Sequence, residues 1–407
     1  MIENIDKMNG WSIEELPNLV FFQEGPGVRN NQYTDSGVKL LNVANLKDGN
    51  VYLDNTDRYI SEEEAYGKYS HFLVDEGDLI IASSGIKVEY FDKKMGFAKK
   101  EHLPLCMNTS TIRFKTLDDN ILNIEYFAYF LKTNYFKKQI SRLITGSAQL
   151  NFGPSHLKQI KVILPPRDVQ KKIVEVLDKA QELIDKRKEQ IDALDELVKS
   201  RFIEMFGDPV INQKQWKKEE LGKVCDVRDG THDSPQYVSD GYPLITSKNI
   251  SNGVINFEDV NFISKEDLES INRRSKVDNG DIIMPMIGTI GNPVIVNTSK
   301  DFAIKNVALI KFNEKTLVTN IFIKSLLESH YFEVAISQNK RGGTQKFIAL
   351  GDIRKLNVIL PPIELQNQFA DFANQVDKLK SQMETSLKEL EDNFNSLMQK
   401  AFKGELF

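Results

Sequence analysis

The chain has 407 residues, of which 41% are hydrophobic and 27% charged, and its formal net charge is −5. This composition is typical of a soluble globular protein. No run of about 18 apolar residues occurs, which excludes a membrane-spanning helix. The acidic balance argues against a free-standing nucleic-acid binder, but not against one whose basic residues are clustered.

The N-terminal and cysteine residues point to the cytoplasm. Residues 1–6 are acidic and no apolar segment follows them, so we expect no signal peptide. Cys106 and Cys225 are the only cysteines. They do not occupy equivalent positions in the repeat described below, so we expect both to stay reduced.

Residues 1–163 are expected to be mostly β-structure. Asp48-Gly49 lies between two strand-like stretches, which predicts a hairpin. A turn at residues 76–78 precedes Leu79-Ile80-Ile81-Ala82, which predicts a buried strand. Residues 121–140 are rich in aromatics at a spacing that suits one helix with a core-facing stripe.

A long helix is predicted from about Arg167 to Met205. Leu164-Pro165-Pro166 ends the β-rich part, and Gly207-Asp208-Pro209 stops the helix. Its apolar stripe recurs at steps of three, four or seven and comprises Ile173, Leu177, Ala180, Ile184, Ile191, Leu194, Val198 and Phe202.

The second half of the chain repeats this plan. Its helix follows Pro361-Pro362, with a stutter near Met383. The stripe of this helix comprises Leu365, Phe369, Phe372, Val376, Leu379, Met383, Leu387, Leu390, Phe394, Leu397 and Ala401.

The two halves are copies of one another. Leu164-Pro165-Pro166 recurs as Leu360-Pro361-Pro362 and Tyr135-Phe136 as Tyr331-Phe332, while Trp11 and Trp216 open the copies. A repeat of this length indicates a tandem duplication of a domain. We therefore divide the chain into a first β-rich domain (1–163), a central helical spacer (164–206), a second β-rich domain (207–359) and a C-terminal helical spacer (360–407).

Each long helix has a single apolar stripe and so requires a partner. The simplest partner is the other helix, because it belongs to the same chain and is always at high local concentration. The fold class expected is α+β, with two tandem β-rich domains and two long helices in an antiparallel coiled coil with pseudo-twofold symmetry. Dimerisation through an intermolecular coiled coil is the alternative.

Motifs for catalysis are missing. Gly288-Thr289-Ile290-Gly291-Asn292 lacks the Lys-Ser/Thr ending of a phosphate loop, and the five histidines are scattered without metal-ligand spacing. No Asn/Asp-Pro-Pro-Tyr motif of an amino-methyltransferase occurs. Asp78 and Asp281 follow turn residues at strand starts, so we interpret them as turn residues.

Three polar loops carry binding chemistry instead. They are a lysine-rich stretch at 87–100, a Gln/Gly/Thr-rich stretch at 338–346 with its counterpart at 145–151, and residues 228–235. Arg and Lys read guanine, Asn and Gln read adenine, and cations grip phosphate. The candidate DNA-binding residues are Lys87, Lys93, Lys94, Lys99, Lys100, Ser147, Gln149 and Asn151 in the first copy and Arg228, Thr231, His232, Ser234, Lys248, Arg341, Thr344, Gln345 and Lys346 in the second.

The order of these features resembles the DNA specificity subunit of type I restriction–modification systems. The stretches at 164–173 and 360–369 are similar to the helix entries of that family, and those at 200–209 and 399–406 to its helix ends. Asp229-Gly230-Thr231-His232 resembles a loop common in its target recognition domains. The first copy departs from this loop, because it has Gln23-Glu24-Gly25-Pro26-Gly27 there.

The resemblance implies a non-catalytic subunit in which each target recognition domain reads one half of a bipartite site in double-stranded DNA and the helices set the spacing. It implies two methyltransferase subunits that carry S-adenosylmethionine, and a restriction/translocase subunit that uses ATP and Mg. No cofactor, metal or membrane is expected for this chain. Alternatives are the recognition subunit of a related phage-defence methylation system, a methyltransferase fused to a recognition module, and a coiled-coil scaffold without nucleic acid.

Overall fold

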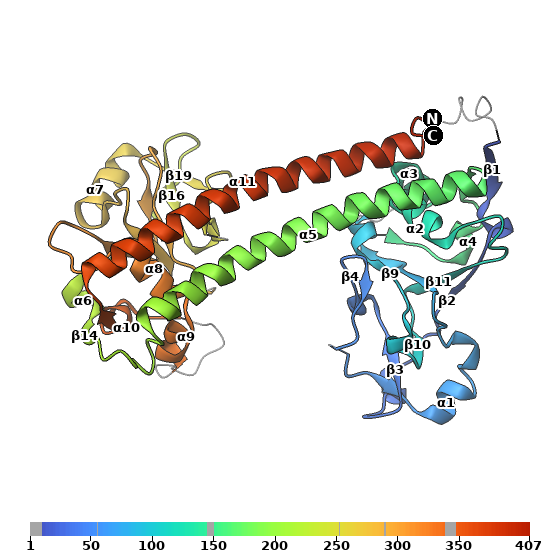
Figure 1. The fold of residues 1–407 in the computed structure, drawn as a ribbon, viewed down its shortest axis with the longest axis horizontal. Coiled ribbons are helices and arrows are strands. Elements are labelled where there is room, and N and C mark those ends of the chain that lie inside the picture. The colour runs from blue at the N-terminus through green and yellow to red at the C-terminus, as the bar shows by residue number, and fades with distance from the viewer. Residues whose placement is uncertain (1–9, 55, 145–149, 252, 289, 338–346) are drawn as a thin grey trace. The chain divides into compact units, whose positions relative to one another are not determined.

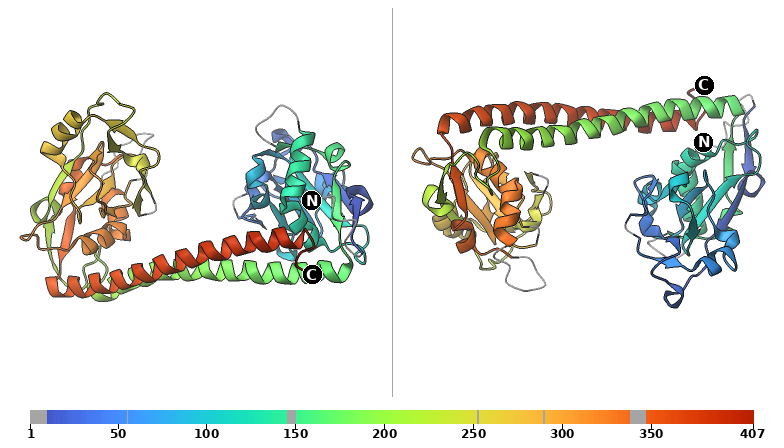
Figure 2. Two further views of the ribbon diagram at one scale, coloured as in Figure 1. Left: turned by 90° about the horizontal axis from the view of Figure 1, so that it is seen from above. Right: turned by 60° about the horizontal axis from the view of Figure 1, so that its bottom comes forward.

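The computed structural model describes residues 10–54, 56–144, 150–251, 253–288, 290–337 and 347–407. It divides into two compact units, one of residues 1–186 with 387–407 and the other of residues 187–386. Each unit therefore contains one β-rich domain and a part of each long helix (Figures 1 and 2). Among the described residues, no helix is long and apolar enough to cross a lipid bilayer.

The first unit contains a four-stranded antiparallel sheet in the order β2-β11-β7-β9 and a three-stranded sheet in the order β10-β3-β6. The strands of these sheets are β2 (Val20–Glu24), β11 (Thr111–Thr116), β7 (Leu79–Ala82), β9 (Met95–Phe97), β10 (Leu105–Met107), β3 (Val38–Leu41) and β6 (Tyr59–Ile60). The two-stranded pairs are β1 (Ser12–Glu15) with β13 (Lys161–Leu164), β12 (Leu150–Asn151) with β8 (Ser84–Ile86), and β4 (Leu46–Lys47) with β5 (Asn50–Val51). The helices of this domain are α1 (Glu62–Tyr66), α2 (Ile124–Lys132), α3 (Asn134–Leu143) and α4 (Pro154–Leu157).

The second unit has the same strand orders, β15-β23-β20-β21 and β19-β16-β22. Its strands are β14 (Lys217–Glu220), β15 (Asp226–Asp229), β16 (Tyr242–Ile245), β17 (Ile250–Ser251), β18 (Val254–Ile255), β19 (Asn261–Ile263), β20 (Ile282–Pro285), β21 (Val294–Ile295), β22 (Ala303–Ile304), β23 (Val307–Lys311) and β24 (Asn357–Leu360). Its helices are α6 (Leu221–Val224), α7 (Lys265–Ser275), α8 (Asn320–Glu328), α9 (His330–Ser337) and α10 (Leu350–Arg354).

The duplication predicted from the sequence is confirmed by strand register. Ser12, which follows Trp11, faces Leu164, and Lys217, which follows Trp216, faces Leu360. The first and last strands of each domain thus pair at the same offsets that the sequence repeat shows.

Several local predictions are also confirmed. Asp48 and Gly49 join β4 to β5 with φ values of 49° and 80°, the left-handed conformation that a tight hairpin turn requires. All four residues of β7 are buried. Asp78 and Asp281 are turn residues, since their carboxylates accept the backbone N–H groups of Asp75 and Asp278 at 2.9 and 2.8 Å.

The single helix expected over residues 121–140 is wrong, because the chain forms α2 and α3 there. The break falls at Thr133, which has an extended backbone with ψ of 151°. Its hydroxyl donates to Phe130 O at 2.6 Å and accepts from Phe136 N at 3.2 Å. The threonine therefore ends one helix and caps the next.

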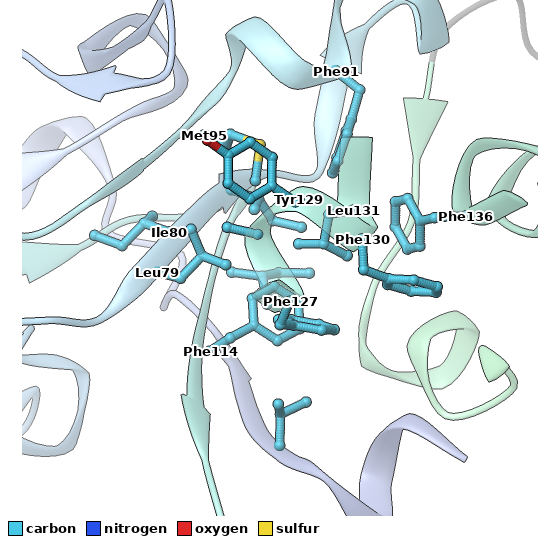
Figure 3. Packing of buried hydrophobic residues seen from close by; sticks show 14 of the residues in the cluster. Leu79, Ile80, Phe91, Met95, Phe114, Phe127, Tyr129, Phe130, Leu131 and Phe136 are labelled. Carbon is cyan, nitrogen blue, oxygen red and sulfur yellow. The ribbon is translucent and has the colours of Figure 1, made fainter. Parts of the chain in front are cut away.

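The aromatic side chains of these helices form the core of the first unit, as predicted. Phe127 on α2 lies 5.3 Å from the ring of Phe114 on β11, and Phe130 lies 6.0 Å from Phe136 on α3 (Figure 3). All four residues are fully buried. A buried phenylalanine contributes about 1.5–3 kcal/mol, so this cluster is a main source of the domain's stability.

The long helices α5 (Arg167–Phe206) and α11 (Ile363–Ala401) lie side by side and are antiparallel (Figures 1 and 2). In the first unit, Ile173 and Leu177 near the start of α5 share a core with Met398 and Ala401 near the end of α11. In the second unit, residues late in α5 meet residues early in α11. The Phe202 ring lies 5.5 Å from that of Phe369, and Lys380 Nζ lies 2.6 Å from Asp195 Oδ1.

The predicted end of α5 has a specific cause. Gly207 adopts φ of +75°, and the Nζ of Lys214 donates to the carbonyls of Glu204 and Met205 at 2.9 and 2.8 Å. Trp216 Nε1 donates to Phe206 O at 2.8 Å. The loop after the helix thus satisfies carbonyls that the helix end leaves without partners.

A buried glutamine joins each domain to the helix that leaves it. Gln170 is fully buried, and its Nε2 donates to the carbonyls of Ile121 and Pro165, both at 2.9 Å, while its Oε1 accepts Asn123 N at 2.8 Å. Gln366 repeats this arrangement with Leu317 O, Pro361 O and Thr319 N.

We expect Gln170→Leu and Gln366→Leu each to destabilise the protein by several kcal/mol, because either change strands one buried N–H and two carbonyls at about 1–3 kcal/mol each. Thermal unfolding of the full chain would measure this loss. Gln375→Leu is the control, since Gln375 is an exposed residue of α11. Equal melting temperatures for Gln170→Leu and Gln375→Leu would show that the buried glutamine does not stabilise the junction of domain and helix.

Candidate nucleic-acid interface

The predicted lysines of the first unit flank the edge strand β9. Lys87, Lys93, Lys99 and Lys100 are exposed, while Lys94 is half-buried and donates to Val43 O at 3.5 Å. Lys87 lies 3.8 Å from Glu89 and Lys99 lies 4.0 Å from Glu101. Exposed pairs at these distances are weak, so these ammonium groups remain available to phosphate.

A hollow of about 640 Å³ lies next to part of this lysine group. Lys39, Tyr52, Tyr59, Lys99 and His102 are among its lining residues. It holds both cations and acids, because Asp54 and Glu101 also line it. Because the lining is mixed, the hollow does not favour an anionic ligand such as phosphate over a cationic one.

Of the predicted amide and hydroxyl loop in the first unit, the structure describes Asn151. It is exposed and pairs with Ser84 across the β12–β8 ladder. Ser147 and Gln149 lie outside the described residues, as do Arg341, Thr344, Gln345 and Lys346 of the second unit.

The loop at 228–235 is organised around Asp229. This carboxylate is 4% exposed and accepts Arg274 Nη2 on one oxygen and His232 Nε2, at 2.8 Å, on the other. The Nδ1 of His232 lies 2.7 Å from Asn306 Oδ1. The next glycine, Gly230, lies so close to the chain that a Cβ would sit 2.2 Å from Ile304 O.

Both ring nitrogens of His232 therefore face oxygen atoms. Hydrogen bonding to Asn306 and then to Asp229 favours the imidazolium and raises the pKa of His232 above its ordinary value. The side chain is 62% exposed, so its ring reaches the surface beside the similarly exposed Arg274.

Arg228 is less free than its sequence suggests. Its Nε and Nη2 donate to Asp226 at 2.9 and 2.5 Å, and its Nη1 donates to Arg274 O at 2.7 Å. Most of its donors are thus already used within the domain. Arg274 is more exposed than Arg228. It was not predicted from the sequence, because it lies near the end of the polar helix α7, outside the candidate loops.

The remaining predicted residues of the second unit also have partners. Ser234 Oγ accepts Lys305 Nζ at 2.5 Å, and Thr231 Oγ1 accepts Asp233 N at 3.1 Å. Lys248 lies apart on a 3₁₀ turn, 3.5 Å from Asp259. Lys305 and Asn306 were likewise missed by the sequence analysis, and neither stands in a motif that could have revealed it.

Comparison with known proteins places the whole chain in one family. The profile of the type I restriction modification DNA specificity domain matches residues 10–195 and 213–392. The specificity subunit of the type I restriction enzyme EcoKI of Escherichia coli (strain K12) is 23% identical, over 98% of this chain and 89% of the relative. The MjaVIII specificity subunit of Methanocaldococcus jannaschii is 22% identical, over 93% and 90%.

Solved structures share the fold. The S subunit of a type I restriction–modification system from M. genitalium is 15% identical, with a TM-score of 0.53 over 97% of this chain and 96% of that one. A chain from a structural study of the complex assembly and conformational transition of a type I R-M system is 17% identical, with a TM-score of 0.61 over 98% and 99%.

We expect Asp229→Asn to lower the pKa of His232 toward its ordinary value near 6.5, because the imidazolium loses its anionic acceptor. The stabilisation from the raised pKa is full below pH 6.5 and is lost as the pH rises through the folded-state value. NMR titration of the histidine ring protons measures the shift. Asp226→Asn, whose carboxylate binds Arg228 instead, is the matched control. An equal pKa in the wild type and in Asp229→Asn would contradict this interpretation.

Proposed function

Since this chain belongs to the type I restriction modification DNA specificity family, we propose that each β-rich domain reads one half of a bipartite DNA sequence. Both units repeat one scaffold, but the polar residues that end its first sheet strand, β2 or β15, differ between the units. This difference carries the proposal. The strand orders are the same in both units. Yet the strand that ends in Gln23-Glu24 in the first ends in Arg228-Asp229 in the second.

The subunit itself supplies recognition and no catalytic group. The absence of an amino-methyltransferase motif from the sequence supports this division of labour. Two methyltransferase subunits would carry S-adenosylmethionine, and a restriction/translocase subunit would use ATP and Mg. The net charge of −5 is compatible with a DNA-recognition subunit whose partner subunits help to enclose the duplex.

The long helices would serve these partners. Apolar side chains remain exposed on them, Leu183 in the first unit and Leu197, Ile203 and Leu379 in the second. Exposed apolar side chains on a charged helix are suitable contacts for another protein. We further propose that helix length sets the spacing between the two half-sites.

We expect the isolated chain to show no methyl transfer and to direct site-specific adenine methylation once a methyltransferase partner is added. Exchanging residues of about 207–360 for another recognition domain should change one half-site and leave the other intact. Sequencing of methylated DNA measures both results. Methylation by the chain alone, or a change in both half-sites, would contradict the proposal.

The role of the helices can be tested by matched insertions. Lys380 pairs with Asp195, so positions after Asp192 and after Met383 stand at the same level of the antiparallel pair. Four residues inserted at both positions add about 6 Å and keep the stripes close to phase, since a helix has about 3.6 residues per turn. One base-pair step is about 3.4 Å, so we expect the methylated site to gain one or two base pairs of spacer.

Matched insertions of two residues are the control, because they turn each stripe by about 200° and break the pairing of the helices. These variants should lose folding or assembly. A four-residue variant that methylates sites with an unchanged spacer would show that the helices do not set the distance.

A further inference from the structure

The two copies carry an acidic residue at one equivalent position, here called the corner, and differ in what surrounds it. Glu24 ends β2 and Asp229 ends β15, and each precedes a glycine whose Cβ would lie 2.2 Å from a carbonyl oxygen, Asn108 O or Ile304 O. The backbone N–H of each glycine donates to the next strand, Gly25 to Thr111 O and Gly230 to Val307 O. The two carboxylates therefore occupy the same position on the scaffold.

Their surroundings are different. Asp229 forms an ion pair with Arg274 and a hydrogen bond with His232. Glu24 is half-buried, and its carboxylate has no polar partner among the residues that the structure describes. Burial raises the pKa of Glu24, as expected for a carboxylate that loses water and gains no cation.

A second polar group at this corner also lacks a partner. Ser83 is 1% exposed, and its hydroxyl has no hydrogen bond to any described residue. Its backbone carbonyl accepts Phe152 N at 3.0 Å, just as Met286 O accepts Ile348 N at 3.0 Å in the second unit. The first copy thus places a hydroxyl where the second has an apolar methionine.

Both groups border the same turn. The Phe152 N–H binds Ser83, and a Cβ on the following Gly153 would lie 3.3 Å from Glu24 Oε2. Asn151 is exposed and lies just before this turn. A half-buried carboxylate without a partner costs free energy, so Glu24 is suited to a ligand that donates hydrogen bonds.

We propose that Glu24 reads an exocyclic amino group, N4 of cytosine or N6 of adenine, in the half-site that the first domain recognises. This inference rests on the proposed function. A phosphate cannot fill the corner because it would repel the carboxylate, whereas a base amino group donates to it, and Glu and Asp pair with the N4 amine of cytosine in the major groove. The second domain places Arg274 and the His232 ring against the equivalent carboxylate, so the two half-sites are read by different side-chain chemistry.

The test uses the full chain assembled with its methyltransferase partner. In Glu24→Ala we expect discrimination at one position of one half-site to fall about tenfold or more, with the other half-site unchanged. Sequencing of methylated DNA shows which position relaxes. The matched control is Glu15→Ala, an exposed carboxylate of the same domain, which should leave both half-sites unchanged.

Base analogues identify the contact directly. Duplexes in which one adenine is replaced by purine, or one cytosine by pyrimidin-2-one, lack a single amino group. Binding of the wild-type complex should fall about tenfold at the position that Glu24 reads, and binding of the Glu24→Ala complex should fall no further there. If the base change and the Glu24→Ala change weaken binding independently at every position, the proposal is overturned.

Stability separates a reading residue from a structural one. Glu24→Gln removes an unpaired, half-buried carboxylate, so we expect an equal or higher melting temperature together with altered discrimination at the same position. A lower melting temperature with unchanged discrimination would make Glu24 structural and overturn the inference. Weaker methyltransferase assembly with unchanged discrimination would assign the carboxylate to a cation of the partner protein and also overturn it.

Failure of the proposed function gives a different result from failure of this inference alone. If the wild-type complex methylates no bipartite site, the proposed function falls and this inference falls with it. If the wild-type complex methylates such a site and neither Glu24 variant alters either half-site, only the inference is overturned.

Discussion

A buried glutamine fixes each β-rich domain to the helix that leaves it, and the rest of the fold depends on this connection. Gln170 and Gln366 each bind one carbonyl of the Leu-Pro-Pro segment, and one carbonyl and one N–H of the loop before α2 or α8. Proline has no N–H to give and restricts the residue before it, so this segment cannot close its own hydrogen bonds. The amide side chain donates to the carbonyl of Pro165 or Pro361 and holds the helix start against its domain.

The helix pair then shares in the core of each domain. Tyr126 and Phe130 of the first unit pack against Phe402, and Phe322 of the second packs against Phe202 and Phe206. In each unit the β-rich domain is therefore stabilised by both long helices. Because the aromatic core is packed against two helices, the polar residues around Glu24 and Asp229 can differ between the copies without loss of core packing.

Variation at those corners is where the two copies diverge. An arginine that binds the carbonyl of a neighbouring segment lies on β11 in the first unit, as Arg113 with His71 O, and on β15 in the second, as Arg228 with Arg274 O. Neither arginine contacts the equivalent carboxylate of its own unit: Arg228 binds Asp226, and Asp229 is bound by Arg274 and His232 instead. The same scaffold thus carries a carboxylate without a polar partner in one unit and a carboxylate paired with Arg274 in the other.

Much of this architecture could be predicted from the sequence, because its signals are periodic or repeated. The stripes of α5 and α11, the Gly207 stop, the Asp48-Gly49 turn and the repeat of Leu-Pro-Pro are patterns of residues close in sequence. Leu379 is an exception, because it was predicted in the stripe of α11 and is exposed. The break at Thr133 was missed, because a lone threonine within an aromatic run has no distinctive pattern. Tertiary structure alone decided the surroundings of Glu24 and Asp229. Arg274, Asn306 and Ser83 are far in sequence from Asp229 and Glu24, and hydrogen bonds between such distant residues depend on strand pairing, which no local pattern encodes.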